Sequence, residues 1–310
     1  MTGTLEKIEL RAVGVIDWAT DIVLEFILII ALTFGLYSLW DSQQVYDAAD
    51  SANYTAYRPE ANDTLSFEEL RKINPEVIGW LTVNDTPIDY PITQTDNNEK
   101  YVNTNAEGQY TLSGSVFLDC RNNSDFDDFN SILYGHHMEK KMMFGALSDF
   151  ADKEYFDSHK YGNLFFNGDN HGVEFFALVL TDAYNKDIFS PAIGEEERQQ
   201  DFIDYLFANA MHSRNISVTT EDRLVLLSTC TSDVTNGRYL LVGKLTDELH
   251  LKEKSSPKPV INLGTWDVQQ LSQLKKIPVW LWLAAIAVLF VLLLIIDGKV
   301  NLKRKINHEE

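Results

Sequence analysis

Cysteine and basic residues are scarce in this sequence, and each shortage excludes a class of protein. Only two cysteines occur, Cys120 and Cys230, and neither has the close Cys or Asp/Glu spacing of a zinc site. Lys and Arg number 26 against 46 Asp and Glu, for a formal net charge of -20. A nucleic-acid binder must neutralise phosphates with basic side chains, so this balance argues against a nucleic-acid partner. Internal repeats and low-complexity tracts are also missing, and a hydrophobic content of 45% excludes a disordered chain.

Charge is missing from one long segment and scarce in a second, which predicts two membrane spans. Residues 277–297 are uncharged up to Ile296, matching the ~20 residues that a helix needs to cross the hydrocarbon core. Tryptophans near the start of this segment suit the aromatic belt at the membrane interface. Residues 22–40 form the second candidate span, of which residues 26–40 are uncharged and the part from Ile22 includes Glu25. We favour an uncleaved signal anchor there over a signal peptide cleaved near Ala49-Asp50-Ser51.

Basic residues near the two spans set the expected orientation, because Lys and Arg concentrate in cytoplasmic loops. They follow the second span and precede the first, although Lys275 and Lys276 lie on the opposite side. We therefore expect both termini in the cytoplasm and residues 41–276 outside the cell. The expected segments are cytoplasmic tails 1–21 and 298–310, a signal anchor 22–40, a stalk or N-terminal helix 41–63, a main domain 64–250, a linker 251–276 and a transmembrane helix 277–297.

The main domain is dominated by strand signals. Eight short segments are rich in aromatic and β-branched residues and are separated by Asn, Asp, Gly or Pro. They are residues 79–83, 88–92, 114–118, 131–135, 163–166, 173–184, 223–229 and 238–245. Strands of this number and length predict a mainly β fold, a closed barrel or a sandwich.

Helical patterns interrupt these strands. A short helix is expected over 67–73, opened by a capping box in which Ser66 is the N-cap and Glu69 lies three residues on. Two further helical insertions are expected over 143–159 and 194–213. The second begins with acidic residues, which suit a helix N-terminus.

The candidate site centres on Cys230, which directly follows the apolar strand 223–229. A nucleophilic thiol needs a cationic or hydrogen-bonding neighbour. His136 and His137 lie at the end of another expected strand, and Arg238 opens the strand after Cys230, so that a hairpin would bring Arg238 near the thiol. In this arrangement Cys230 attacks a carbonyl carbon, a histidine protonates the leaving amine, and Arg238 holds a carbonyl or the oxyanion.

Other interpretations of these residues stay open. Cys230 taken alone fits a buried residue, or a disulfide with Cys120 outside the cell. Ser228 and Thr229 either line a substrate groove or satisfy backbone groups. Asp233 either orients the histidine or Arg238, or is a solvated loop residue. Tyr134 is expected to be packed, and Cys120 to be structural or incidental.

At these residues the chain resembles the sortases, the cysteine transpeptidases of Gram-positive cell surfaces. The sortase signature is a strand ending T-L-x-T-C, an upstream histidine and an arginine on the next strand. Here the strand reads Leu227-Ser228-Thr229-Cys230, with Leu226 where the family has its first threonine. The stretch "LYGHHM" resembles the Y-G-H pattern, which makes His136 the catalytic candidate and His137 its neighbour, and Arg238 resembles the conserved arginine.

The resemblance covers about residues 64–250 and is closest to class B sortases. Stretches such as "INPEVIGWLTVNDTPIDYPI", "GSVFLD" and "MMFGALSDFADKEYFDSHKYGNLFF" carry it. It implies an eight-stranded sortase β-barrel, here flanked by two transmembrane helices. Ordinary class B enzymes have a single N-terminal anchor, and a second span is common in sortases that polymerise pilins. The Asp-Pro-aromatic lid of class C pilus sortases is missing, so the chain resembles the class B-like pilus sortases.

The resemblance also implies a reaction. Cys230 cleaves a Thr–Gly-type bond in a C-terminal sorting signal of a surface protein or pilin, and an amine resolves the acyl-enzyme. The amine is a pilin lysine or the cross-bridge of a peptidoglycan precursor. No cofactor and no metal are implied, and the location is the plasma membrane of a Gram-positive bacterium.

Three alternatives remain on the sequence alone. The first is a sortase that anchors single surface proteins to peptidoglycan rather than polymerising pilins. The second is a thiol hydrolase, in which water resolves the acyl intermediate. The third is a non-catalytic, membrane-tethered barrel in which a Cys120–Cys230 disulfide serves as a staple.

Overall fold

The computed structural model describes residues 2–59, 65–230, 236–250, 281, 284 and 286–291, and for residues 2–12 and Cys230 it describes the backbone alone. Two compact units divide the chain, one of residues 1–44 with 259–310 and one of residues 45–258. The predicted linker 251–276 and C-terminal tail 298–310 lie outside the described residues. So does most of the predicted span 277–297, whose described residues are helical.

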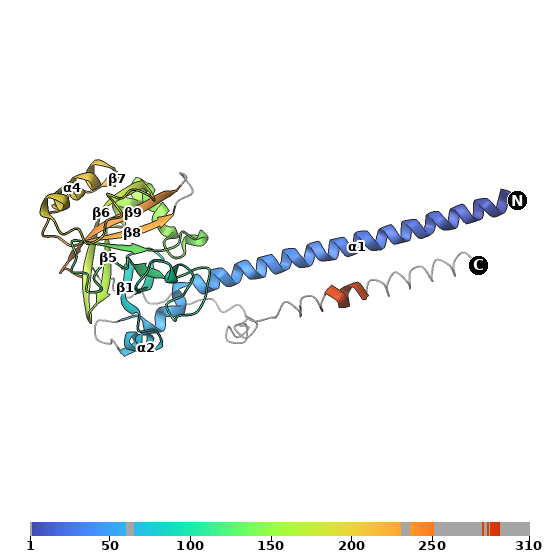
Figure 1. Cartoon of the computed structure of the whole chain (residues 1–310), viewed down its shortest axis with the longest axis horizontal. Helices are drawn as coiled ribbons and strands as arrows, with labels where there is room; N and C mark the ends of the chain where they lie inside the picture. The colour runs from blue at the N-terminus through green and yellow to red at the C-terminus, as the bar shows by residue number, and fades with distance from the viewer. Residues whose placement is uncertain are drawn as a thin grey trace. The chain divides into compact units, whose positions relative to one another are not determined.

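The first unit contains most of α1 (Thr2–Ala49), a single helix of 48 residues (Figure 1). Its apolar side chains are exposed, with Leu28 at 68% and Phe34 at 70%. A helix of a soluble core would bury such side chains. Among the described residues, α1 is the one helix long and apolar enough to cross a membrane, as a membrane anchor or a signal sequence does.

The second unit is a β-barrel built from one sheet. The described strands are ordered β5-β1-β2-β3-β4-β8-β9-β6-β7, and a further pairing of β5 with β6 closes the first eight into a barrel. Their bounds are β1 Val77–Val83, β2 Asp89–Thr93, β3 Val116–Leu118, β4 Asn130–Tyr134, β5 Tyr161–Phe166, β6 Asp169–Asp182, β7 Ala210–Ser213, β8 Leu224–Cys230 and β9 Gly237–Thr246. The predicted mainly β fold with an eight-stranded barrel is confirmed.

Strand β7 is the one described strand that the sequence did not predict. Helix α4 (Glu196–Ala208) stops at Asn209, and the next four residues pair antiparallel with the outer side of β6. The prediction of helix to residue 213 is therefore wrong at its end. The segment has too few residues for a clear alternation, and its pairing with a distant strand decides its conformation.

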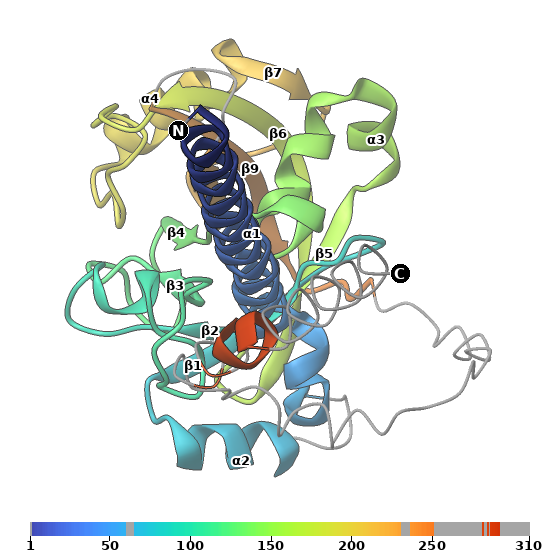
Figure 2. The same cartoon turned by 90° about the vertical axis from the view of Figure 1, so that its right-hand side faces the viewer.

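The remaining helices are short and border the barrel. They are η1 Ser51–Tyr57, α2 Leu65–Ile73, η2 Lys100–Val102, η3 Glu139–Lys141, η4 Gly145–Ala151 and α3 Lys153–Ser158. In both views α2 and α4 lie at opposite ends of the barrel (Figures 1 and 2).

Two local helix predictions need correction. The single helix expected over 143–159 is divided into η4 and α3, because the Asp152 side chain caps α3 by accepting from the Tyr155 N–H at 2.9 Å. The predicted capping box is also wrong. Ser66 lies inside α2, and its hydroxyl donates to the Arg58 carbonyl at 3.3 Å.

The apolar run Leu224–Leu227 is explained by burial on both faces of β8. Val225 and Leu227 belong to the core that fills the barrel, whereas Leu224 and Leu226 belong to a second core that includes residues of α4. Strand β8 runs parallel to β4 and antiparallel to β9. A strand with two buried faces has no solvent side, so its residues do not alternate between apolar and polar. This rigid central strand delivers Ser228, Thr229 and Cys230 to one end of the barrel.

Residues 45–57 belong to the barrel unit and pack against it. Ala49 and Tyr54 are buried there. The Tyr90 hydroxyl donates to the Ala49 carbonyl at 2.9 Å and accepts from the Met143 N–H at 3.0 Å. The last turn of α1 is therefore hydrogen-bonded, through one side chain of β2, to the segment that follows η3.

Candidate active site

Strand pairing brings the three predicted catalytic positions to the same end of the barrel. In the parallel pair of β4 and β8, Tyr134 lies opposite Ser228, and His136 and Cys230 each follow two residues later. Cys230 in turn lies opposite Arg238 in the antiparallel pair of β8 and β9. Positions that are about a hundred residues apart in sequence thus become neighbours through backbone register alone.

A pocket of about 290 Å³ occupies this end of the barrel. Four of the predicted site residues line it, namely His136, Ser228, Thr229 and Arg238. The rest of its lining comes from Asn98, Val102, Phe117, Tyr134 and Gly135. His137 is exposed and is absent from this lining, while Asp233 lies outside the described residues. The described backbone of Cys230 directly follows Thr229 and is paired with Arg238, and both of these residues line the pocket.

The hydroxyl groups of Ser228 and Thr229 are buried, and both residues line the pocket. Each residue is 2% exposed, and neither hydroxyl has a hydrogen-bond partner among the described residues. Among the described residues, no backbone group is within hydrogen-bond reach of either hydroxyl. Buried polar atoms without a partner are uncommon in native proteins and call for a ligand, a water or a functional reason.

His136 is held by one backbone hydrogen bond. Its Nε2 lies 2.8 Å from the carbonyl oxygen of Val102. A carbonyl oxygen only accepts, so Nε2 carries the proton of this bond. Arg238 is half-buried, and its Nη1 donates to the Gly237 carbonyl at 3.2 Å. The five donors of a guanidinium leave it able to bind a ligand oxygen at the same time.

Tyr134 is more than a packed residue, because its hydroxyl donates to a buried carboxylate. The acceptor is Asp119 Oδ2, 3.0 Å away, and Asp119 is fully buried. Arg121 donates to both oxygens of this carboxylate, with Nε to Oδ1 at 2.8 Å and Nη2 to Oδ2 at 2.7 Å. Burial alone would raise the pKa of Asp119, but the hydrogen bonds from Arg121 outweigh it and lower this pKa. Burial and the charge of Asp119 raise the pKa of Tyr134, which keeps its phenol neutral.

The sequence did not identify Asn98, Val102, Asp119 and Tyr134 as parts of the site. Asn98 and Val102 lie on the long connection between β2 and β3, where polar residues give no distinguishing signal. Asn98 joins that connection to the end of β3, since its Oδ1 accepts from the Cys120 N–H at 2.8 Å. Cys120 itself is a free, half-buried thiol, which contradicts the disulfide on which the non-catalytic alternative depends.

Among the described residues, no three His, Cys, Asp or Glu side chains are grouped so that they could hold a metal ion. The groups around the pocket are instead hydroxyls, an imidazole and a guanidinium. Such groups bind a peptide through its carbonyl oxygens and exchange protons with it.

The closed eight-stranded barrel with this strand-end pocket is the architecture of a sortase-type cysteine transpeptidase, and the curated relatives show that the chain is one. Over 209 residues it is 34% identical to Sortase B of Listeria monocytogenes, an alignment that covers 66% of this chain and 82% of that protein. The chain therefore belongs to the sortase B family. No family model matches the sequence.

Two solved structures are similar in sequence as well as in fold. The sortase B from the Type II pilus of Streptococcus pneumoniae shares 47% identity at a TM-score of 0.52, covering 59% of this chain and 99% of that one. A Streptococcus pyogenes class B sortase involved in pilus biogenesis shares 39% identity at a TM-score of 0.54, covering 58% of this chain and 98% of that one.

Proposed function

We propose that this chain is a membrane-anchored pilus sortase, which joins pilin subunits by transpeptidation. The observation that carries this proposal is the similarity to two pilus-associated class B sortases, at 47% and 39% identity. The predicted second membrane span adds support from the sequence, because a C-terminal anchor is common in pilin-polymerising sortases.

The proposed chemistry assigns one role to each of three residues. The Cys230 thiolate attacks the carbonyl carbon of the scissile peptide bond in a sorting signal, and a C–S bond forms. The C–N bond then breaks, and His136 gives its proton to the departing amine. Arg238 donates hydrogen bonds to a carbonyl oxygen of the substrate or to the oxyanion. A second amine, the side chain of a pilin lysine, then attacks the thioester and gives a proton to His136, so that a new C–N bond forms, the C–S bond breaks and the thiolate is released.

Substrate binding in this proposal uses the two buried hydroxyls at the end of β8. Ser228 and Thr229 lie next to the nucleophile in sequence, and each has an oxygen that can accept or donate. Their proposed partners are backbone groups of the sorting signal. His137 and Asp233 are weaker candidates for substrate contact. Helix α1 would hold the enzyme at the outer face of the plasma membrane, with both termini in the cytoplasm.

The test uses the full chain, expressed together with its own pilin in cells that lack the endogenous gene. We expect ladders of high-mass pilin polymers with the wild type, and none with Cys230→Ala. Cys120→Ala is the matched control, since it removes the other thiol and should keep the ladders. Single pilins attached to peptidoglycan, with no ladders, would refute polymerisation and favour the anchoring alternative.

A second experiment separates transfer from hydrolysis. The purified full chain in detergent is incubated with a peptide that carries the pilin's sorting signal, with and without an added lysine-containing pilin fragment. A transpeptidase yields a ligated product that grows with the concentration of the amine. Cleaved peptide alone, at every amine concentration, would favour the thiol hydrolase.

A further inference from the structure

The Val102 carbonyl that binds His136 belongs to a turn anchored by several hydrogen bonds. Val102 is the last residue of η2, and the residue before it, Tyr101, is 1% exposed. The Tyr101 hydroxyl donates to Glu76 Oε2 at 2.5 Å and accepts from Asn74 Nδ2 at 2.9 Å. Tyr101, the neighbour of Val102, is thus hydrogen-bonded to the residues that precede β1.

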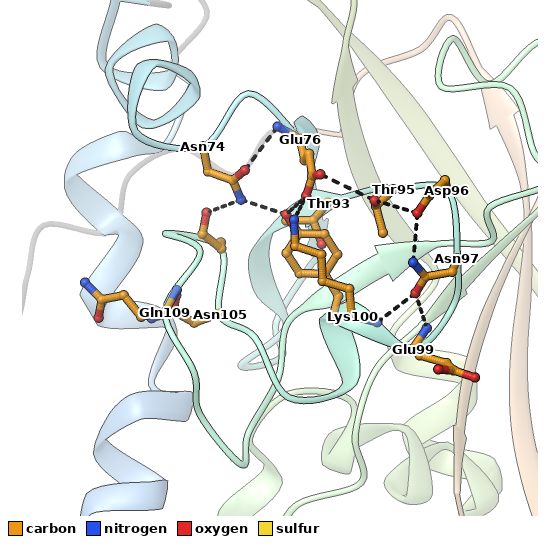
Figure 3. A network of polar contacts seen from close by, with 12 residues as sticks. Asn74, Glu76, Thr93, Thr95, Asp96, Asn97, Glu99, Lys100, Asn105 and Gln109 are labelled. Atoms are coloured by element: carbon orange, nitrogen blue, oxygen red, sulfur yellow. Dashed lines mark hydrogen bonds and ion pairs between the residues drawn. The ribbon is translucent and has the colours of Figure 1, made fainter.

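Glu76 is the centre of this anchor. Its carboxylate contacts Lys100 and Thr95 (Figure 3). Oε2 lies 2.5 Å from Lys100 Nζ, and Oε1 accepts from the Thr95 hydroxyl at 3.3 Å. Asn97 Oδ1 in addition accepts from the N–H groups of Glu99 and Lys100 at the start of η2. Burial would raise the pKa of Glu76, but the hydrogen bonds from Lys100 and Tyr101 outweigh it, so this pKa is lowered and the carboxylate is ionised at neutral pH.

The backbone of Gly114 packs closely against the Val102 carbonyl. Its φ is +60°, and a Cβ placed there would lie 2.5 Å from the Val102 oxygen and 2.6 Å from the Tyr101 oxygen. The neighbouring Ser115 N–H donates to the Tyr101 carbonyl at 3.0 Å. The two carbonyls are therefore fixed between a backbone contact on one side and the Tyr101 anchor on the other.

We infer that Glu76, acting through Tyr101, is a positioning residue for His136. The carboxylate holds Tyr101, Tyr101 holds η2, and η2 presents the Val102 carbonyl to Nε2–H. This selects the neutral tautomer with its proton on Nε2 and leaves Nδ1 as the nitrogen that exchanges protons in the pocket. The effect of this tautomer on catalysis rests on the proposed role of His136 as the acid. The tautomer itself follows from the hydrogen bond to Val102 and does not depend on that role.

The Val102 carbonyl acts on His136 as the third residue of a catalytic triad acts on its histidine: it fixes the tautomer and the orientation of the ring. An oriented acceptor on one imidazole nitrogen selects the nitrogen that meets the nucleophile. Here the acceptor is a backbone carbonyl, and the ionised group is one residue further away. The role of a backbone oxygen cannot be tested by replacing its own side chain. Substitution of Glu76 and Tyr101, which hold this oxygen in place, can test it.

The test records the tautomer directly, with the full chain in detergent micelles and ¹⁵N-labelled histidine. Long-range ¹H–¹⁵N spectra are taken at a pH where the ring is neutral, and His136 is assigned by the signal lost in His136→Gln. We expect Nε2 to be the protonated nitrogen in the wild type. Tyr101→Phe, Glu76→Ala and Gly114→Ala should each raise the Nδ1–H fraction, whereas Glu76→Gln, which keeps an acceptor for Tyr101, should restore the wild-type ratio.

Kinetics on the sorting-signal peptide supply the second readout. One lost hydrogen bond in the anchor should lower kcat about three- to tenfold and leave KM unchanged. Tyr205→Phe is the matched control, because this α4 hydroxyl accepts from Asn185 Nδ2 at 2.7 Å and its loss should change neither the tautomer nor kcat.

Two results would overturn the inference. One is a wild-type His136 protonated on Nδ1, and the other is a wild-type tautomer ratio in folded Tyr101→Phe and Glu76→Ala. Failure of the proposed function would look different. Transfer would then continue at the wild-type rate in His136→Gln, while the spectra of the anchor variants would still report whether Glu76 and Tyr101 set the tautomer.

Discussion

Replacing the buried carboxylate of Asp119 by an amide should destabilise the barrel and loosen one wall of the pocket. Asp119 accepts four hydrogen bonds, two from the Arg121 side chain, one from the Arg121 backbone N–H and one from the Tyr134 hydroxyl. In Asp119→Asn one acceptor oxygen becomes an NH₂ group that faces donors, and the negative charge is lost. The variant keeps the size of the side chain, so it opens no cavity.

The size of the effect follows from these bonds. Hydrogen bonds to a charged group contribute about 1.5–3 kcal/mol each, but the Arg121 side chain is 56% exposed and water replaces part of what it loses. We therefore expect a loss of about 2–3 kcal/mol in the free energy of unfolding. For a domain of this size, at roughly 2–4 °C per kcal/mol, Tm falls by about 5–10 °C.

The pH dependence gives the sharper test. The pKa of Asp119 is lowered in the folded chain from its ordinary value of 3.8. A lowered carboxyl pKa stabilises the folded state above the unfolded pKa, and this stabilisation is lost as the pH falls through the folded pKa. The difference in Tm between wild type and Asp119→Asn should be constant above about pH 5 and should shrink as the medium becomes more acidic than the unfolded pKa.

Thermal unfolding of the full chain in detergent, followed by near-UV circular dichroism, measures this difference. Asp157→Asn is the control, because Asp157 pairs with Lys153 on the exposed side of α3 and is itself 52% exposed. Its loss should leave Tm unchanged. Equal Tm values for Asp119→Asn and wild type, or a difference that persists unchanged at acid pH, would refute this account of the carboxylate.

Three further predictions address the site and the fold. Ser228→Ala should lower the transfer rate about tenfold and leave Tm unchanged, because the hydroxyl has no hydrogen-bond partner among the described residues; a large fall in Tm would contradict that. Gly145→Ala should reduce both Tm and transfer, because a Cβ there overlaps the Met138 carbonyl beside the His136 segment. Gly194→Ala, where a Cβ meets nothing within 4 Å, should match the wild type. Denaturation without reductant should expose two thiols per chain, and a count of zero would restore the disulfide alternative.

Local patterns were sufficient for most of the barrel. Each of the eight predicted strands corresponds to an observed one, because turn residues separate short segments of strong β preference. The longest apolar run was predicted as a strand, and burial on both faces explains why it does not alternate. The wrong predictions lie where a distant strand pairing or a helix cap sets the local conformation. Strand β7 pairs with the edge of β6, and Asp152 divides the helix expected over 143–159.

The site was predictable only in part, because some of its residues reach the pocket through contacts between distant segments. His136, Cys230 and Arg238 follow or begin strands, and their residue types suggest chemistry, so the sequence could identify them as candidates. Asn98 and Val102 belong to a connection whose composition is ordinary. They become part of the pocket because the barrel brings the loop between β2 and β3 against the ends of β4 and β8.

The sequence by itself determined the family, the order of the strands along the chain and the residues able to carry a thiol-based transfer. These are properties of side-chain type and of short-range pattern. Only the tertiary structure decided that Ser228 and Thr229 lie buried with no hydroxyl partner among the residues it describes, that Asp119 orients Tyr134, and that Glu76 reaches His136 through Tyr101 and a backbone carbonyl. Those relations are set by the register and closure of the barrel. Register depends on contacts between residues far apart in the chain, which no local pattern encodes.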